Sequence, residues 1–274
     1  MMWVSSVRMA ADAYLVCLHH ALTTEKEEVL GLLVGQYTEG TDGVKCDIYS
    51  AVTLRRSDKR KDRVEISPEM LIEAQQKAEQ MSAACGQELN IVGWYHSHPH
   101  ITVWPSDIDL QTQAGYQQMD NRFIGLIFSV YNEDKKTKVG THQVTCFQAI
   151  NQNPEGESPQ YVRLAVPLQV TPQPKIHSNN QQALESLCST LYEEQNEVLE
   201  ASRQRSSQYP LAHLHNASVL VRSVCNLTSL VSGPLVATVE SQLQHLQEQK
   251  HQLQHEASYL RQLLKDNNIS TTAA

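Results

Sequence analysis

The sequence predicts an α/β fold, in which helices flank a mixed β-sheet and a C-terminal helical, coiled-coil extension follows. Up to about residue 167, short runs of β-branched and apolar residues alternate with segments of helical periodicity. This alternation is typical of a sheet covered by helices. Beyond that point the chain is rich in Gln, Glu, Leu and Ser with helical spacing only. The 274 residues are enough for one sizeable domain plus the extension.

The elements of the first part follow ordinary start and stop signals. Before the central stretch they are expected at residues 4–7 (strand), 11–22 (helix), 29–34 and 44–54 (strands) and 67–85 (helix). Pro68 at the start of this last helix and Gly86 after its end are typical helix boundaries. The charged burst at 55–63 is interpreted as a solvated loop, with a contact surface for an acidic partner or for ubiquitin as the alternative.

The second part divides into strands, a linker and helices. A helix is expected from Ser106 to about residue 119, and strands are expected at 123–131, 139–150 and 161–166. We therefore predict a domain at residues 1–167, a linker at 168–177, helices and a coiled coil for partner binding at 178–268, and a tail at 269–274.

The central stretch, residues 92–109, holds the candidate functional residues. Side chains alternate faces along a strand, so His96 and His98 point the same way at a strand end. Ser106 follows a proline and precedes Asp109 by three, which indicates a helix start with Asp109 in its first turn. Two imidazoles and a carboxylate leave one tetrahedral position open, as a hydrolytic zinc ion needs.

Each of these features also has an ordinary structural interpretation. A His-x-His pair on a strand is more often structural or exposed than metal-binding. Ser106 and Asp109 resemble a capping box, although Glu or Gln is the usual partner. Glu28 lies at the mouth of an apolar strand, where it is either a solvated charge or a placed base. Trp104 either lines a substrate groove or packs against the domain.

Taken together, the spacing resembles the motif of the JAMM (MPN-plus) metalloprotease family. The run His-Ser-His-Pro begins at His96, and Ser-x-x-Asp spans Ser106 to Asp109. The family also has a glutamate before a Gly-x-apolar-x-Gly strand, and Glu28 occupies that place. The resemblance implies an MPN fold and one catalytic Zn²⁺ held by His96, His98 and Asp109. It also implies that Glu28 is the general base and then the general acid, and that Ser106 donates to the oxyanion.

The whole chain resembles one branch of this family, the BRCC-type deubiquitinases of the BRISC and BRCA-A assemblies. The matching stretches include residues 54–68 and 92–106, and the similarity fades in the C-terminal helices. The resemblance implies hydrolysis of lysine-63-linked polyubiquitin and an MPN-minus, Abraxas-type pseudoenzyme partner joined through the C-terminal helices. It further implies a dimer of heterodimers with scaffold subunits and a cytoplasmic and nuclear localisation.

The last helix has the most regular pattern in the chain. Its apolar positions alternate steps of three and four, which is typical of a heptad seam. The seam consists of Val236, Val239, Leu243, Leu246, Lys250, Leu253, Ala257, Leu260 and Leu264. Lys250 is its one charged interruption, and such a residue commonly specifies register or partner. We expect a helical partner, with helices folded back on the domain's own core as the alternative.

Composition narrows the remaining function classes. The net charge of -8 argues against a general nucleic-acid binder. No run of 18 apolar residues is present, so neither a transmembrane helix nor a membrane partner is expected. The six cysteines are scattered, without a Cys-x-x-Cys pair, which favours free thiols. Two alternatives to the main hypothesis remain: a zinc isopeptidase for another ubiquitin-like modifier, and a non-catalytic MPN scaffold subunit.

Overall fold

The computed structural model describes most of the chain, in two compact units. The described residues are 3–25, 27–41, 43–55, 66, 68–134, 136–153, 158–172, 178–205, 210–226, 229 and 233–271. Unit 1 is Met1–Val231 and unit 2 is Ser232–Ala274. The strands are β1 (Val4–Ala10), β2 (Leu30–Gly40), β3 (Gly43–Thr53), β4 (Asn90–Pro99), β5 (Ile124–Glu133), β6 (Gly140–Asn151), β7 (Tyr161–Val166) and β8 (Leu168–Thr171). The helices are α1 (Ala11–Ala21), α2 (Pro68–Cys85), α3 (Asp107–Gln117), α4 (Ser178–Arg205), α5 (Pro210–Asn226) and α6 (Gly233–Thr271).

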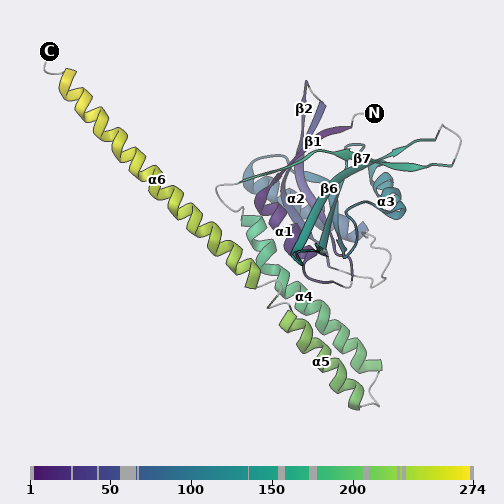
Figure 1. Ribbon diagram of the computed structural model, residues 1–274. Helices are drawn as coiled ribbons and strands as arrows, with labels where there is room; N and C mark the ends of the chain where they lie inside the picture. Colours follow the sequence, from purple (N-terminus) through teal and green to yellow (C-terminus); the bar gives the residue numbers. More distant parts are fainter. Residues whose placement is uncertain are drawn as a thin grey trace. The chain divides into compact units, whose positions relative to one another are not determined.

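A single mixed sheet organises unit 1. Its eight strands run in the order β7-β6-β5-β4-β2-β3-β1-β8 (Figure 1). The pairs β4–β5, β1–β3 and β1–β8 are parallel, and the other pairs are antiparallel. Strand β4 lies near the middle, between β2 and β5. The predicted α/β class with a mixed sheet is confirmed.

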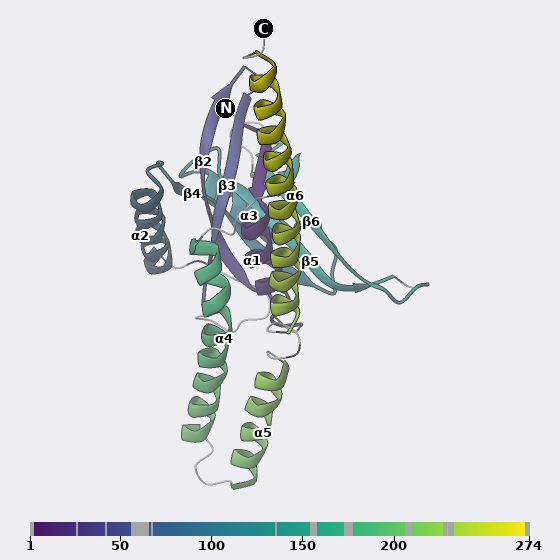
Figure 2. The same ribbon diagram turned by 90° about the vertical axis from the view of Figure 1, so that its left-hand side faces the viewer.

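The two faces of the sheet carry different helices. On one face, Leu32 and Trp94 belong to a core cluster with Ala74 of α2 and Leu110 of α3. The next residue of β4, Tyr95, points to the other face, where His20 of α1 contacts its hydroxyl at 2.8 Å. Figure 2 shows α2 and α1 on opposite sides of the strands. Because side chains alternate along a strand, Trp94, His96 and His98 of β4 all face α3.

Strand β8 corrects the expected linker at 168–177. Residues Leu168–Thr171 pair in parallel with β1, and the backbone N–H of Val7 donates to Pro167 O at 2.8 Å. The prediction of a linker is therefore wrong for residues 168–171. A four-residue edge strand between two prolines has too little apolar pattern to be recognised, and its partner lies at the other end of the domain.

Helix α4, the first of the C-terminal helices, packs against the sheet domain. For this helix the structure agrees with the alternative interpretation, in which the helices fold back on the domain's own core. Its buried leucines are Leu184, Leu187, Leu191 and Leu199. At its start Asn180 is fully buried, where it accepts a hydrogen bond from Ser50 Oγ (2.6 Å) and donates to Tyr49 O (2.9 Å). Helices α4 and α5 form a hairpin within unit 1 (Figure 1). The compact unit thus extends past the boundary expected at residue 167.

The first residue of the charged burst, Arg55, contacts helix α4. Arg55 forms ion pairs with Glu193, at 4.0 Å, and with Glu197. Residues 56–63 lie outside the described residues, so the loop interpretation stays a prediction.

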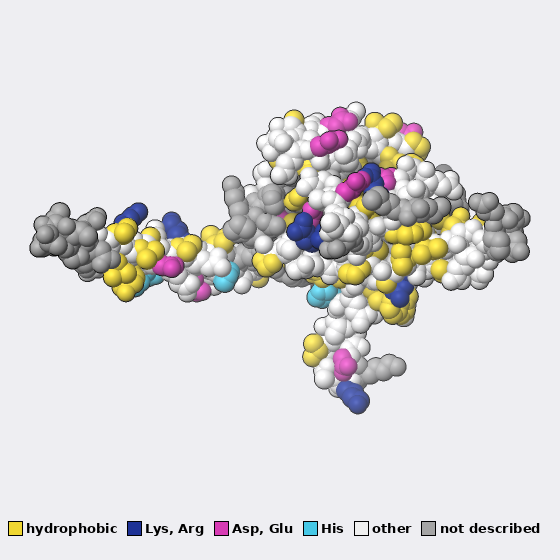
Figure 3. All heavy atoms as spheres, turned by 90° about the horizontal axis from the view of Figure 1, so that it is seen from above, with side chains coloured by type: hydrophobic (Ala, Val, Ile, Leu, Met, Phe, Trp, Pro, Cys, Tyr) yellow, Lys and Arg dark blue, Asp and Glu magenta, His cyan; other side chains and the backbone are white. Residues whose placement is uncertain are grey.

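Helix α6 makes up the described part of unit 2, and it continues to Thr271, into the expected tail. Its seam is exposed to solvent in the single chain, with Val236 at 54%, Leu243 at 55% and Leu264 at 64% exposure. Figure 3 shows hydrophobic side chains along this helix, with charged side chains between them. Among the described residues, no helix is both long and apolar enough to cross a membrane.

Replacing Asn180 by Ala is expected to loosen α4 from the sheet. The change leaves the Ser50 hydroxyl and the Tyr49 carbonyl without their buried partner, which costs about 1–3 kcal/mol of unfolding free energy. Urea unfolding of the full chain measures this cost. Gln181→Ala is the control, because Gln181 is exposed and its amide donates to Glu185 of the same helix. Equal stability of the two variants would contradict this role of Asn180.

Candidate metal centre

The two histidines come from the centre of the sheet. Strand β4 places His96 opposite Leu30 of antiparallel β2 and opposite Ile127 of parallel β5. Pairing on both sides holds the backbone firmly. Both imidazoles are buried, with 1% and 3% exposure for His96 and His98. They share the face of the sheet that α3 covers, as their spacing predicts.

Asp109 reaches the histidines from the first turn of α3. Ser106 is the N-cap, and its Oγ accepts a hydrogen bond from Asp109 N at 3.2 Å. Asp109 Oδ2 in turn accepts from Ser106 N at 2.7 Å and from Ser106 Oγ at 2.8 Å. This is the reciprocal capping box, with Asp in place of the usual Glu or Gln. The cap thereby holds the carboxylate in one orientation at the helix start.

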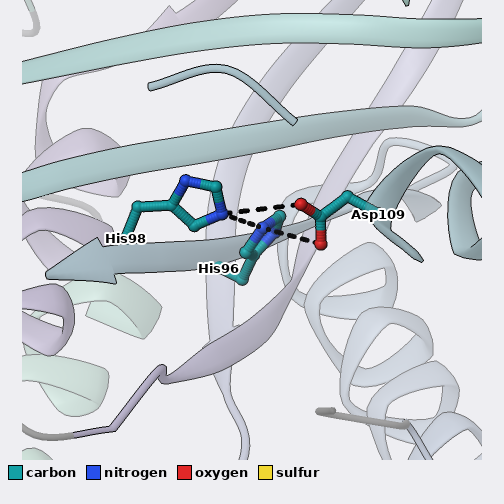
Figure 4. A group of neighbouring side chains, drawn as sticks. All are labelled: His96, His98 and Asp109. Carbon is teal, nitrogen blue, oxygen red and sulfur yellow. Dashed lines mark hydrogen bonds and ion pairs between the residues drawn. The ribbon is translucent and has the colours of Figure 1, made fainter. Parts of the chain in front are cut away.

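The three side chains converge, as Figure 4 shows. The two Nε2 atoms of His96 and His98 lie 3.1 Å apart. Asp109 Oδ1 is 3.3 Å from His96 Nε2, and Oδ2 is 3.5 Å from His98 Nε2. In the part of the chain that the structure describes, this is the one such group of His, Cys, Asp or Glu able to hold a metal ion.

The separations fit a tetrahedral metal site. Metal–ligand bonds of about 2.0–2.1 Å at tetrahedral angles put neighbouring ligand atoms roughly 3.3–3.4 Å apart. The Nε2–Nε2 distance of 3.1 Å and the distance of 3.3 Å from His96 Nε2 to Asp109 Oδ1 lie close to this value. His98 Nδ1 donates to Thr102 O at 2.7 Å, which leaves the lone pair on Nε2, where a metal would bind.

The electrostatics of the group also favour a cation among these side chains. Burial alone would raise the pKa of Asp109, but hydrogen bonds from His96 and His98 outweigh it and lower that pKa far below its usual value. Burial lowers the pKa of His98, yet Asp109, Thr102 and Glu28 together raise it above its usual value. A proton and a metal ion would therefore compete for Nε2 of His98.

Glu28 lies beside this group without joining it as a ligand. Val29 N donates to Ser97 Oγ and Ser97 N donates to Val29 O, both at 2.9 Å. One step further in this antiparallel register, Glu28 comes opposite His98 and on its face of the sheet. Its negative charge contributes to the raised pKa of His98. The role of Glu28 stays a prediction, and the sequence analysis misses Ser97, which ties the start of β2 to the strand that carries the two histidines.

Two further residues at the rim have clear positions. Trp104 is 55% exposed, and the Arg163 guanidinium lies 3.9 Å from its ring centroid. Trp104 therefore packs on one face and remains accessible on the rest. The exposed His100 lies 3.5 Å from Glu25 through Nε2 and stays outside the ligand group.

The chain matches two protein-family models. Residues 3–122 match "JAB1/Mov34/MPN/PAD-1 ubiquitin protease", and residues 180–260 match "BRCC36 C-terminal helical domain". A Xenopus tropicalis protein named Lys-63-specific deubiquitinase BRCC36 is 43% identical over 96% of this chain and 99% of its own length. The chain belongs to the BRCC36 family of JAB1/Mov34/MPN/PAD-1 ubiquitin proteases. The predicted MPN fold and the predicted enzyme class are thus confirmed.

Other BRCC36 relatives agree along nearly the whole chain. The Rattus norvegicus protein of the same name is 40% identical, covering 94% of each chain. The Homo sapiens protein is 38% identical over 90% of this chain and 92% of its own. The similarity thus includes the C-terminal helices, where the sequence alone indicates only a shared layout.

His96→Ala and Asp109→Ala are each expected to remove the bound metal, because each deletes one of three ligands. Elemental analysis of the purified proteins should give about one metal ion per wild-type chain and far less than one in the variants. The control is His100→Asn, which changes a nearby histidine at a left-handed backbone position (φ 61°) that Asn tolerates. Full metal content in Asp109→Ala would exclude Asp109 as a ligand.

Proposed function

We propose that this chain is a zinc-dependent isopeptidase that hydrolyses lysine-63-linked polyubiquitin. The observation that carries the proposal is the convergence of His96, His98 and Asp109 with Glu28 beside them. The group combines a three-ligand metal site and an adjacent carboxylate, which are the parts of a metal-assisted hydrolase. The relatives are named Lys-63-specific deubiquitinases, which supports the choice of substrate.

His96 and His98 would hold zinc through Nε2, and Asp109 through Oδ1. The other carboxylate oxygen, Oδ2, already accepts two hydrogen bonds from Ser106. Zinc bound there would polarise the scissile carbonyl and bring the pKa of a water molecule towards neutrality. Nitrogen and carboxylate ligands in this number are the donor set of hydrolytic zinc sites.

Glu28 is the general base and acid in this proposal. It is half-buried and stands on the same face as the ligands, close enough for its charge to act on His98. There it takes the proton from the attacking water and later delivers it to the departing lysine amine. The pairing of Val29 with Ser97 sets its distance from the strand of the histidines.

Ser106 is the proposed hydrogen-bond donor to the oxyanion. Its hydroxyl accepts from Asp109 N and donates to Asp109 Oδ2. A hydroxyl has one proton, so stabilising the oxyanion requires the O–H to turn away from Asp109. When the O–H turns away, Asp109 Oδ2 still accepts the hydrogen bond from Ser106 N at 2.7 Å. The cap can therefore persist through the reaction.

The C-terminal helices are the proposed partner-binding region. The exposed seam of α6 is typical of a helix that pairs with another helix. We propose an MPN-minus, Abraxas-type pseudoenzyme as that partner, in a complex that can dimerise and recruit scaffold subunits. The match of residues 180–260 to a family-specific helical domain supports a dedicated role for these helices.

Cleavage of lysine-63-linked di-ubiquitin is expected to require an intact site. The assay uses the full chain alone and the full chain co-expressed with the MPN-minus partner. Glu28→Gln should retain metal and lose turnover by about 10²–10⁴-fold, because it removes the proton acceptor. Glu27→Gln is the matched control, since it makes the same change one residue away. Gel analysis of di-ubiquitin cleavage measures the rates.

The outcomes separate the alternatives. Activity in the Glu28→Gln protein would exclude the proposed role of Glu28. A metal-loaded protein that cleaves a different ubiquitin-like conjugate, and not di-ubiquitin, would contradict the substrate. A metal-loaded complex that cleaves neither would favour a scaffold subunit.

Ser106→Ala is expected to lower kcat by about 10²–10³-fold, since it removes one oxyanion donor. It should also cost about 1 kcal/mol of stability, because the helix cap is lost. Ser106→Thr retains the hydroxyl and the cap, so it should restore most of both. Steady-state kinetics and thermal unfolding distinguish the two effects. Normal kcat in Ser106→Ala would remove Ser106 from the mechanism.

A further inference from the structure

The two metal-site histidines are held in place by different means. His98 is oriented by a hydrogen bond from Nδ1 to Thr102 O at 2.7 Å. The corresponding atom of His96, Nδ1, is buried and meets no hydrogen-bond partner among the residues that the structure describes. A metal-binding histidine usually donates from its second nitrogen to an acceptor that fixes the ring. Another contact must therefore orient the His96 ring.

The Trp94 indole is that contact. The two rings are stacked, with centroids 4.6 Å apart and planes inclined by only 14°. Trp94 lies two residues before His96 on β4, so both side chains stand on the face that α3 covers. Both are almost completely buried. Stacking on a fixed indole restricts rotation of the imidazole about its side-chain bonds.

Gln113 fixes the indole. Trp94 Nε1 donates to Gln113 Oε1 at 2.7 Å. The amide of Gln113 can face only one way, because its Nε2 donates to Gln117 Oε1 (2.9 Å) and to Phe123 O (2.8 Å). Gln117 is oriented by the backbone of Ala149, which donates to Oε1 at 2.7 Å and accepts from Nε2 at 3.0 Å. The chain of hydrogen bonds thus runs from β6 through α3 to the indole.

Helix α3 consequently acts on the metal site at two levels. Asp109, in its first turn, is a ligand, and Gln113 follows four residues later on the same face of the helix. One rigid helix therefore sets both the position of the carboxylate and, through Trp94, the position of the His96 ring.

We propose that Gln113 is a positioning residue for the metal ligand His96 and acts through the stacked Trp94 indole. The inference rests on the proposed zinc function. Gln113 touches neither metal nor substrate in this scheme. Its effect is to hold the empty site in the geometry that zinc requires, so that little reorganisation accompanies binding.

The test is the rate at which zinc passes from the loaded full-length chain to a chromogenic chelator. Gln113→Met removes the acceptor for Trp94 with little change of shape, and we expect zinc release to be about tenfold faster or more. Gln148→Met is the matched control. Gln148 is also fully buried and also donates to Phe123 O, at 3.1 Å, whereas the Trp94 N–H donates to Gln113. Equal release rates in the two variants would overturn the proposal.

A second variant separates positioning from general loss of stability. Trp94→Phe retains an aromatic ring but deletes the N–H donor, so it should also release zinc faster. This variant replaces Gln113→Met in the test if Gln113→Met does not fold. In the Trp94→Phe background, Gln113→Met should add no further acceleration, since the link is already broken. Additive effects would overturn the proposal. A wild-type chain that holds no zinc would instead contradict the proposed function itself.

Discussion

The hydrogen bonds between Ser106 and Asp109 are the constraint on which the site depends. They form the cap of α3 and also hold the carboxylate towards His96 and His98. The cap satisfies N–H groups at the start of the helix, and the carboxylate that takes part in it is the third member of the candidate metal site. The hydrogen bonds that cap α3 therefore also place the carboxylate beside the two histidines.

The sheet brings the other parts to this point. Strand β4 is paired on both sides, with β2 antiparallel and β5 parallel, so the histidines stand on a rigid backbone. The antiparallel pairing with β2 carries Glu28 to His98 from a place in the sequence about seventy residues earlier. Behind the site, buried amides join α3 to β6 and to the indole beneath His96. Rigid support of this kind is what a precise ligand geometry requires.

The sequence is most informative where the signal is local. His96, His98 and Asp109 follow from the periods of a strand and of a helix start, and the capping box is recognisable from two residues. Glu28 is different, because a carboxylate before a strand has no local mark of function, and only the family resemblance singles it out. No feature of the sequence indicates a function for Gln113. It stands in a helix rich in glutamine, where the expected place of an amide is the solvent face, yet it is fully buried.

The sequence by itself determined the α/β class, the positions of most helices and strands, the three residues of the candidate metal site and the heptad pattern of α6, because each depends on residues close together in the chain. Only the tertiary structure decided that β8 joins the sheet, that α4 packs on it, that Ser97 holds the start of β2 and that Gln113 holds Trp94. These are pairings between distant segments, such as Asn180 with Ser50. Many partners could satisfy a buried polar group, and the choice among them appears only when the chain has folded.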